Sequence, residues 1–116
     1  MKFEELYKEL GGDYPEAVER FGGENTLKRF VLKFMNDDNF KLLSESLEKG
    51  DCKTAFRFAH TLKGICLNMD FGNMTSLARD ITEKLRAGDL NGAAEVFPSL
   101  KREYDRTIEL LKMTER

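Results

Sequence analysis

The sequence is poor in several residue types: it has one histidine, two prolines, two cysteines and no tryptophan. It also lacks any apolar run approaching the ~18 residues of a transmembrane helix, so we expect no membrane span. One histidine and two distant cysteines do not make a tetrahedral zinc site, so we expect no metal centre.

The two cysteines, Cys52 and Cys66, do not predict a disulfide. If one helix carries both, they lie about 21 Å apart at 1.5 Å per residue, which is too far for a bridge. A reduced, cytoplasmic protein is the plain interpretation. The N-terminal segment MKFEELYKEL agrees with it, because this segment is amphipathic and acidic and does not resemble a signal peptide.

An excess of charge of either sign is missing as well. The 19 basic and 21 acidic side chains give a net charge of −2, whereas a nucleic-acid binder needs a basic excess. The length of 116 residues, 41% of them hydrophobic, suits one core rather than two. We therefore expect a single domain over residues 1–116.

Strand signals are nearly absent, and helical periodicity recurs along the whole chain. We expect helices over residues 3–10, 15–21, 25–36, 39–50, 51–69, 74–88 and 89–113. An apolar stripe that includes Phe30 marks the third of them, and Pro98 should kink the last or break it in two. The fold class is all-α: an antiparallel four-helix bundle with two short N-terminal helices packed on one end.

The single histidine, His60, lies on the fifth predicted helix, for which Asp51 is a good N-cap. On a helical wheel of about 100° per residue, an apolar stripe falls opposite His60, and this stripe must face the core. It consists of Ala55, Phe58, Leu62, Ile65 and Met69. The residues that cluster around His60 are Lys53, Phe56, Arg57, Lys63, Gly64 and Leu67. His60 is therefore predicted to point outward rather than to be a satisfied core histidine.

The neighbours of His60 give this position meaning. Gly64 follows one turn later, although a glycine inside a helix costs roughly 1 kcal/mol relative to alanine. Because it faces away from the core, we interpret it as clearance for something bulky. Lys63 places a cation near the ring. Phe56 and Leu67 flank His60 on the outward face and suggest a contact surface for a partner protein.

Three kinds of chemistry compete for an exposed histidine. A general base lacks a partner, because no nucleophile shares the face and Thr61 points roughly 100° away. A metal site lacks a second ligand one turn before or after. A nucleophile that itself carries a phosphoryl group needs an exposed ring, room and a cation. The stretch HTLKG offers all three.

The stretch AHTLKG resembles the signature of histidine-containing phosphotransfer (Hpt) domains, the intermediate carriers of multistep His–Asp phosphorelays. The similarity extends to ERFGGENTLKRFVLKFMND, LEKGDCKTAFRFAHTLKG and NMDFGNMTSLARDITEKLRAGD, and so to nearly the whole chain. It implies that His60 is the phosphoacceptor, through its Nε2. It also implies that Lys63 assists the phosphoryl group and that Gly64 gives the partner access.

The resemblance implies partners too. Lys53, Phe56, Arg57 and Leu67 would form the docking surface for a response-regulator receiver domain, alone or within a hybrid histidine kinase. The receiver would bring Mg²⁺, and this chain would need no cofactor. The protein would be a carrier without kinase activity of its own, and the family favours a monomer.

The sequence departs from the family at Asp70, where relatives usually have glycine. We expect Asp70 to cap the following helix, with Gly72 supplying flexibility. Three rival hypotheses stay open at this point: a helical docking module that binds receivers without phosphoryl transfer, a carrier that no longer accepts phosphate, and an enzyme that uses general-base chemistry.

Overall fold

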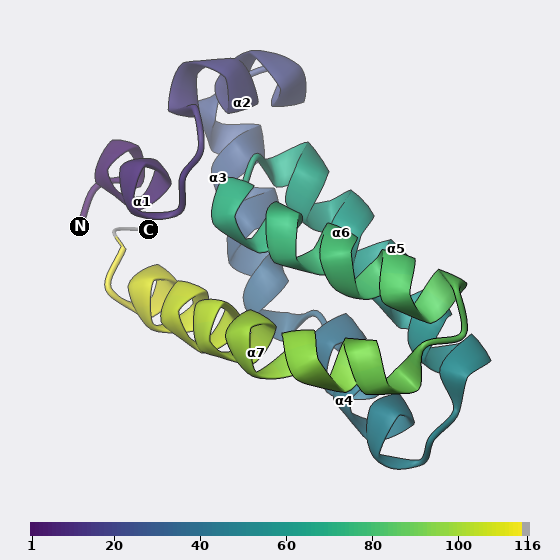
Figure 1. Cartoon of the computed structure of the whole chain (residues 1–116). Coiled ribbons are helices and arrows are strands. Elements are labelled where there is room, and N and C mark those ends of the chain that lie inside the picture. Colours follow the sequence, from purple (N-terminus) through teal and green to yellow (C-terminus); the bar gives the residue numbers. More distant parts are fainter. Residues whose placement is uncertain (115–116) are drawn as a thin grey trace.

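A computed structural model describes residues 1–114, and within them the chain is helical and contains no strand (Figure 1). The prediction of an all-α protein is therefore confirmed. The elements are α1 (Phe3–Glu9), α2 (Tyr14–Phe21), α3 (Glu24–Lys33), the 3-10 turn η1 (Phe34–Asn36), α4 (Asn39–Glu48), α5 (Cys52–Met69), α6 (Gly72–Arg86) and α7 (Leu90–Lys112).

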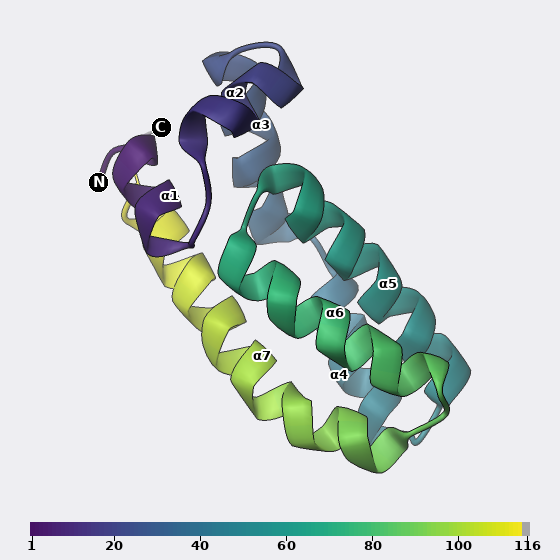
Figure 2. The same cartoon turned by 45° about the horizontal axis from the view of Figure 1, so that its top comes forward.

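The four C-terminal helices pack against one another in chain order: α4 on α5, α5 on α6 and α6 on α7. Only two or three residues separate each of these helices from the next, so consecutive helices run in opposite directions. Figures 1 and 2 show them lying side by side. Helix α5 is thus held between α4 and α6, which leaves one of its faces free.

The start of α5 is set by its N-cap, as the sequence predicted. The Asp51 carboxylate accepts a hydrogen bond from the backbone N–H of Thr54 at 3.1 Å, which satisfies one of the free donors in the first turn. Hydrogen bonds from the side chain and backbone of Thr54 lower the pKa of the Asp51 carboxyl. This cap places His60 in the third turn of α5.

A single cluster of buried apolar side chains runs through the described part of the chain, and every α-helix contributes members to it. Its aromatic centre is the stacked pair Phe40–Tyr104, whose ring centroids are 4.1 Å apart, with Phe97 stacked on Phe40 at 5.4 Å. This core joins α4 to α7 across the molecule.

The first helix packs at the end of the molecule where α7 finishes (Figure 2). Arg106 of α7 pairs with the Glu9 carboxylate at 3.1 Å and donates to the Glu9 carbonyl at 2.9 Å. The ammonium group of Met1 donates to the Met113 carbonyl at 2.9 Å. The two ends of the chain are therefore tied together.

Two expectations about the helices need correction. Helix α7 continues through Pro98 as one element, so Pro98 does not break it in two. Pro98 and Ala94, whose carbonyl loses its helical donor, are both exposed, so water can satisfy that carbonyl. Phe30 is not part of the core stripe, because its side chain is 40% exposed and packs against the Phe21 ring at 5.3 Å.

The turn between α5 and α6 also differs from the expectation. Asp70 ends α5 in a left-handed conformation, with φ of 60°, and its carboxylate accepts from the backbone N–H of Asp13 at 2.6 Å. It does not cap α6, whose N-cap is Phe71 and has no side-chain hydrogen bond. A Cβ at Gly72 would collide with the Gly11 carbonyl, so this glycine permits close backbone packing.

Candidate functional site

His60 lies on the free face of α5, and its side chain is exposed as predicted. Among residues 1–114, nothing hydrogen-bonds to its ring; its nearest aromatic neighbour is Phe56, with ring centroids 5.7 Å apart and planes inclined by 39°. Both ring nitrogens are therefore available to a reacting group from outside.

The opposite face of α5 packs into the core. Ala55, Leu62 and Met69 are buried, and the half-buried Phe58 and Ile65 pack against them. Two residues outside the predicted stripe, Ala59 and Cys66, are fully buried too. They lie on one flank of that stripe, so the buried face of α5 is turned by several tens of degrees from the one expected.

This rotation corrects the prediction for Phe56. Phe56 is half-buried and packed against the core rather than openly exposed. Its ring lies at the boundary between α5 and α6, where the guanidinium of Arg86 stands 4.9 Å from the ring centroid. Lys63, on the same flank of α5, is half-buried as well.

The surroundings of Gly64 and Lys63 agree with the roles predicted for them, clearance beside His60 for Gly64 and a cation near its ring for Lys63. A Cβ built at Gly64 meets nothing within 4 Å, so neither the fold nor a neighbouring helix requires a glycine there. Lys63 makes no ion pair with any residue that the structure describes. Its ammonium group is free to meet an anion brought to His60.

The remaining predicted site residues surround His60 along the same face. Lys53 and Arg57 are exposed toward the start of α5, and Leu67 is 50% exposed toward its end. Thr61 is occupied locally, because its hydroxyl donates to the Arg57 carbonyl at 3.0 Å. All of the residues predicted for the site therefore come from one helix.

Helix α2 borders this face at the end of α5. Arg20 donates to the carbonyls of Leu67 and Asn68 at 3.1 and 2.9 Å, and Glu16 holds it from the other side at 3.0 Å. These carbonyls belong to the last turn of α5, where the Leu67 carbonyl also accepts from the backbone N–H of Asp70 at 3.2 Å, and a cation is favourable at this end of a helix.

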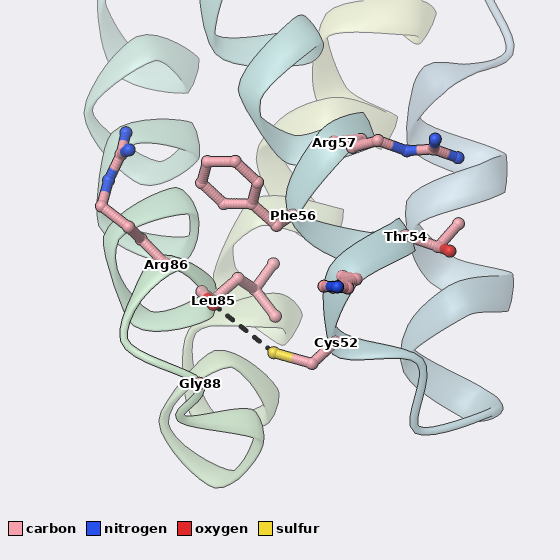
Figure 3. A pocket seen from close by; sticks show the side chains of 8 residues that line it. Cys52, Thr54, Phe56, Arg57, Leu85, Arg86 and Gly88 are labelled. Carbon is pink, nitrogen blue, oxygen red and sulfur yellow. Dashed lines mark hydrogen bonds between the residues drawn. The ribbon is translucent and has the colours of Figure 1, made fainter.

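A cavity of about 670 Å³ opens beside the histidine, at the start of α5 and the end of α6 (Figure 3). Figure 3 shows Phe56 and Arg86 approaching each other across the gap, while Cys52 donates to the Leu85 carbonyl at 3.4 Å. The cavity is lined by Cys52, Lys53, Thr54, Phe56, Arg57, Leu85, Arg86 and Gly88.

The cavity residues at the end of α6 and in the turn after it were not identified from the sequence. Leu85 and Arg86 of α6 and Gly88 of the turn lie more than twenty positions after His60, and nothing in the local pattern relates them to it. The relevant signal is the pairing of the start of α5 with the end of α6, which follows from their antiparallel packing.

No group of three or more potential metal ligands converges anywhere in residues 1–114. None of the helices in that range is both long and apolar enough to cross a membrane. The thiol of Cys66 lies on the core-facing side of α5, and its burial raises its pKa to about 12.

A scan against protein families gives a direct match. The model of the Hpt domain matches residues 31–110, more than half of the chain. This chain belongs to the Hpt domain family. The match confirms the family that the sequence resemblance indicated, and Hpt domains are phosphocarrier modules of two-component phosphorelays rather than kinases. The comparisons with curated proteins and with solved structures found no match.

The matched region includes the helix that carries His60. This region contains η1, α4, α5 and α6 entirely and most of α7, and it leaves α1, α2 and most of α3 outside. The Hpt domain family interacts with response-regulator receivers. The exposed histidine and all its neighbours on α5 thus fall within the matched region.

Proposed function

We propose that this Hpt protein is a phosphoryl carrier of a multistep His–Asp phosphorelay, with His60 as the phosphoacceptor. The observation that carries the proposal is the position of His60, exposed on the free face of α5 and without a hydrogen-bond partner among the described residues. It is also the sole histidine of the sequence, so a phosphohistidine can form nowhere else.

The transfer step follows from the chemistry of imidazole. The lone pair of the His60 Nε2 attacks the phosphorus of a receiver aspartyl phosphate in line, forming a P–N bond. The P–O bond to the aspartate breaks, and the aspartate leaves as a carboxylate. In the next step a second receiver aspartate attacks the phosphoramidate, and the ring recovers its lone pair.

Lys63 and Gly64 support this step in different ways. The free ammonium of Lys63 offsets the negative charge on the phosphoryl oxygens as they arrive. Gly64 leaves open space one turn from His60, within which the incoming receiver can approach. Neither residue takes part in bond making.

The docking surface for the receiver consists of Lys53, Phe56, Arg57 and Leu67, which surround His60 on α5. The receiver is a separate response regulator or part of a hybrid histidine kinase, and it brings the Mg²⁺. The carrier acts as a cytoplasmic monomer and has no ATP-dependent kinase activity.

We further infer that the architecture is an antiparallel four-helix bundle of α4 to α7, with two short N-terminal helices packed on one end. The chain is one domain over residues 1–116, of which 115–116 lie outside the described residues. The single buried cluster shared by the N-terminal helices and α4 to α7 supports both inferences.

Phosphoryl acceptance tests the proposal. The protein is incubated with phosphoramidate, and separately with phosphorylated receiver domains and Mg²⁺, and its intact mass is measured. We expect one acid-labile phosphoryl adduct, absent from His60→Gln, whose helical circular dichroism should equal that of the wild type. Lys63→Ala should accept phosphoryl more slowly and keep the same helicity.

The possible outcomes separate the competing functions. Receiver binding without an adduct would identify a docking module or a carrier that has lost acceptance. An adduct that persists in His60→Gln would place the phosphoryl group elsewhere and contradict the proposal. The absence of both adduct and binding would mean that this chain keeps the Hpt fold without its function.

A further inference from the structure

The cavity between α5 and α6 has a distinct chemical character. The half-buried Phe56 and Cys52 supply apolar surface, and the nearly buried Leu85 lies in the cavity wall. The lining side chains that carry charge are Lys53, Arg57 and Arg86. None of the lining residues in the described part of the chain is acidic. This local basic patch contrasts with the net charge of −2 of the whole chain.

Two acidic side chains near the cavity, Asp51 and Glu83, leave its cations weakly paired or unpaired. Asp51 accepts the N-cap hydrogen bond at the start of α5. Glu83 pairs with Arg86 at 3.3 Å, but both side chains are more than half exposed, and an exposed pair on one helix face is weak. A carboxylate from outside can therefore compete for Arg86, while Lys53 and Arg57 make no ion pair with any described residue.

Phe56 connects the cavity to the phosphoacceptor, because its side chain lines the cavity and its ring lies next to the His60 ring. Its ring lies 5.7 Å from the His60 ring and 4.9 Å from the Arg86 guanidinium carbon, so Arg86 stands within about 11 Å of the imidazole. A stable protein interface buries about 800 Å² per partner, equivalent to a disc of roughly 16 Å radius. An interface of this size centred on His60 would therefore reach Arg86 at the edge of the cavity.

We propose that the cavity is a specificity pocket for the receiver, and that it takes an apolar side chain flanked by a carboxylate. The apolar side chain packs between Phe56 and Leu85, and the carboxylate pairs with Arg86. Arg86 is then a specificity-determining residue contributed by α6, outside the helix that carries His60. This inference rests on the proposed function of His60.

The test compares charge variants at Arg86 with a matched variant elsewhere. A panel of purified receiver domains from the same genome is phosphorylated, and the one that transfers fastest to the wild-type chain is used. The variants are Arg86→Glu, Arg86→Met, which keeps packing on Phe56 without the charge, and Arg102→Glu. Arg102 is exposed on α7 and does not line the cavity.

Charge reversal at Arg86 should raise KM for the phosphorylated receiver about tenfold and change kcat less than twofold, because charges at an interface act mainly on association. Arg86→Met should give a smaller rise, and Arg102→Glu none. The KM of the wild type should increase with salt more steeply than that of Arg86→Glu. All variants should keep wild-type helicity and wild-type labelling by phosphoramidate.

Labelling by phosphoramidate, which needs no receiver, distinguishes failure of the pocket proposal from failure of the proposed carrier function. Normal labelling by phosphoramidate together with equal KM values for Arg86→Glu and Arg102→Glu would overturn the pocket and leave the carrier standing. A wild-type chain that accepts phosphoryl from no receiver in the panel would overturn the proposed function, and the pocket would fall with it. Loss of phosphoramidate labelling in Arg86→Glu would also overturn the pocket, since Arg86 would then act on His60 itself.

Discussion

Gly64 is a residue whose identity the fold does not explain. Its backbone is helical and the space beside it is empty, so alanine would fit and would favour the helix. A glycine that costs helix stability and meets no neighbour indicates a requirement that arises only when a partner is present. The clearance beside His60 is such a requirement.

Substitution of Gly64 should therefore move stability and transfer in opposite directions. Gly64→Ala should raise the free energy of unfolding by about 1 kcal/mol, measured by urea denaturation. Gly64→Leu should slow transfer from a phosphorylated receiver about tenfold or more by displacing the docked partner. The control Ala94→Leu introduces the same side chain at an exposed position of α7, away from His60. Normal transfer in Gly64→Leu would refute the clearance argument.

The two cysteines should differ strongly in reactivity. Burial raises the pKa of Cys66 to about 12, so at pH 8.5 fewer than about one in a thousand of its thiols is ionised. Cys52 is half-buried and should be alkylated first by iodoacetamide, as peptide mapping would show. Labelling of Cys66 should rise with pH toward 12, since the thiolate forms there. Equal labelling of both in the folded protein would contradict the burial of Cys66; unfolded protein serves as the control.

The helices themselves follow largely from the sequence. Glycine stops, the Asp51 cap and the apolar periodicity predicted each helix to within a few residues. The prediction was weaker where the packing of neighbouring helices decides which residues are buried. The buried face of α5 is turned from the one expected because α6 packs on one flank, and Phe56 is half-buried for this reason. Arg86 could not be assigned, because the sequence does not show which residues of α6 face α5.

The α5–α6 turn shows how one position serves two helices. Asp70 adopts a left-handed conformation, which suits glycine best and costs other residues about 1–2 kcal/mol. A glycine at this position would adopt the same backbone conformation without that cost. In this chain the Asp70 carboxylate instead accepts from the Asp13 backbone N–H, and so it joins the turn to the start of α2.

Variants at Asp70 should separate strain from hydrogen bonding. Asp70→Ala keeps the strain and loses the bond to Asp13, so it should lower the free energy of unfolding by about 1–2 kcal/mol. Asp70→Gly loses the same bond but relieves the strain, and its stability should fall between alanine and the wild type. Urea denaturation at neutral pH measures both. An alanine variant as stable as the glycine variant would show that the left-handed backbone carries no strain.

At the scale of the whole molecule, the N-terminal helices belong to the same core as the bundle although the family match leaves them out. Leu6 and Tyr7 of α1 are fully buried, and Arg106 ties Glu9 to α7. Arg20 of α2 holds the last turn of α5, the helix that presents His60. The N-terminal segment therefore supports the helix that bears the site.

This arrangement predicts one cooperative unfolding transition. Two of the three tyrosines, Tyr7 and Tyr14, lie in the N-terminal helices, so near-ultraviolet circular dichroism follows that end, whereas the signal at 222 nm follows all helices. The two curves should coincide in urea. Leu6→Ala should shift both together and cost about 2–5 kcal/mol, while Phe30→Ala, at an exposed position, should cost less. An earlier near-ultraviolet transition in Leu6→Ala would mean that α1 and α2 detach first, and α5 would then hold His60 in place without them.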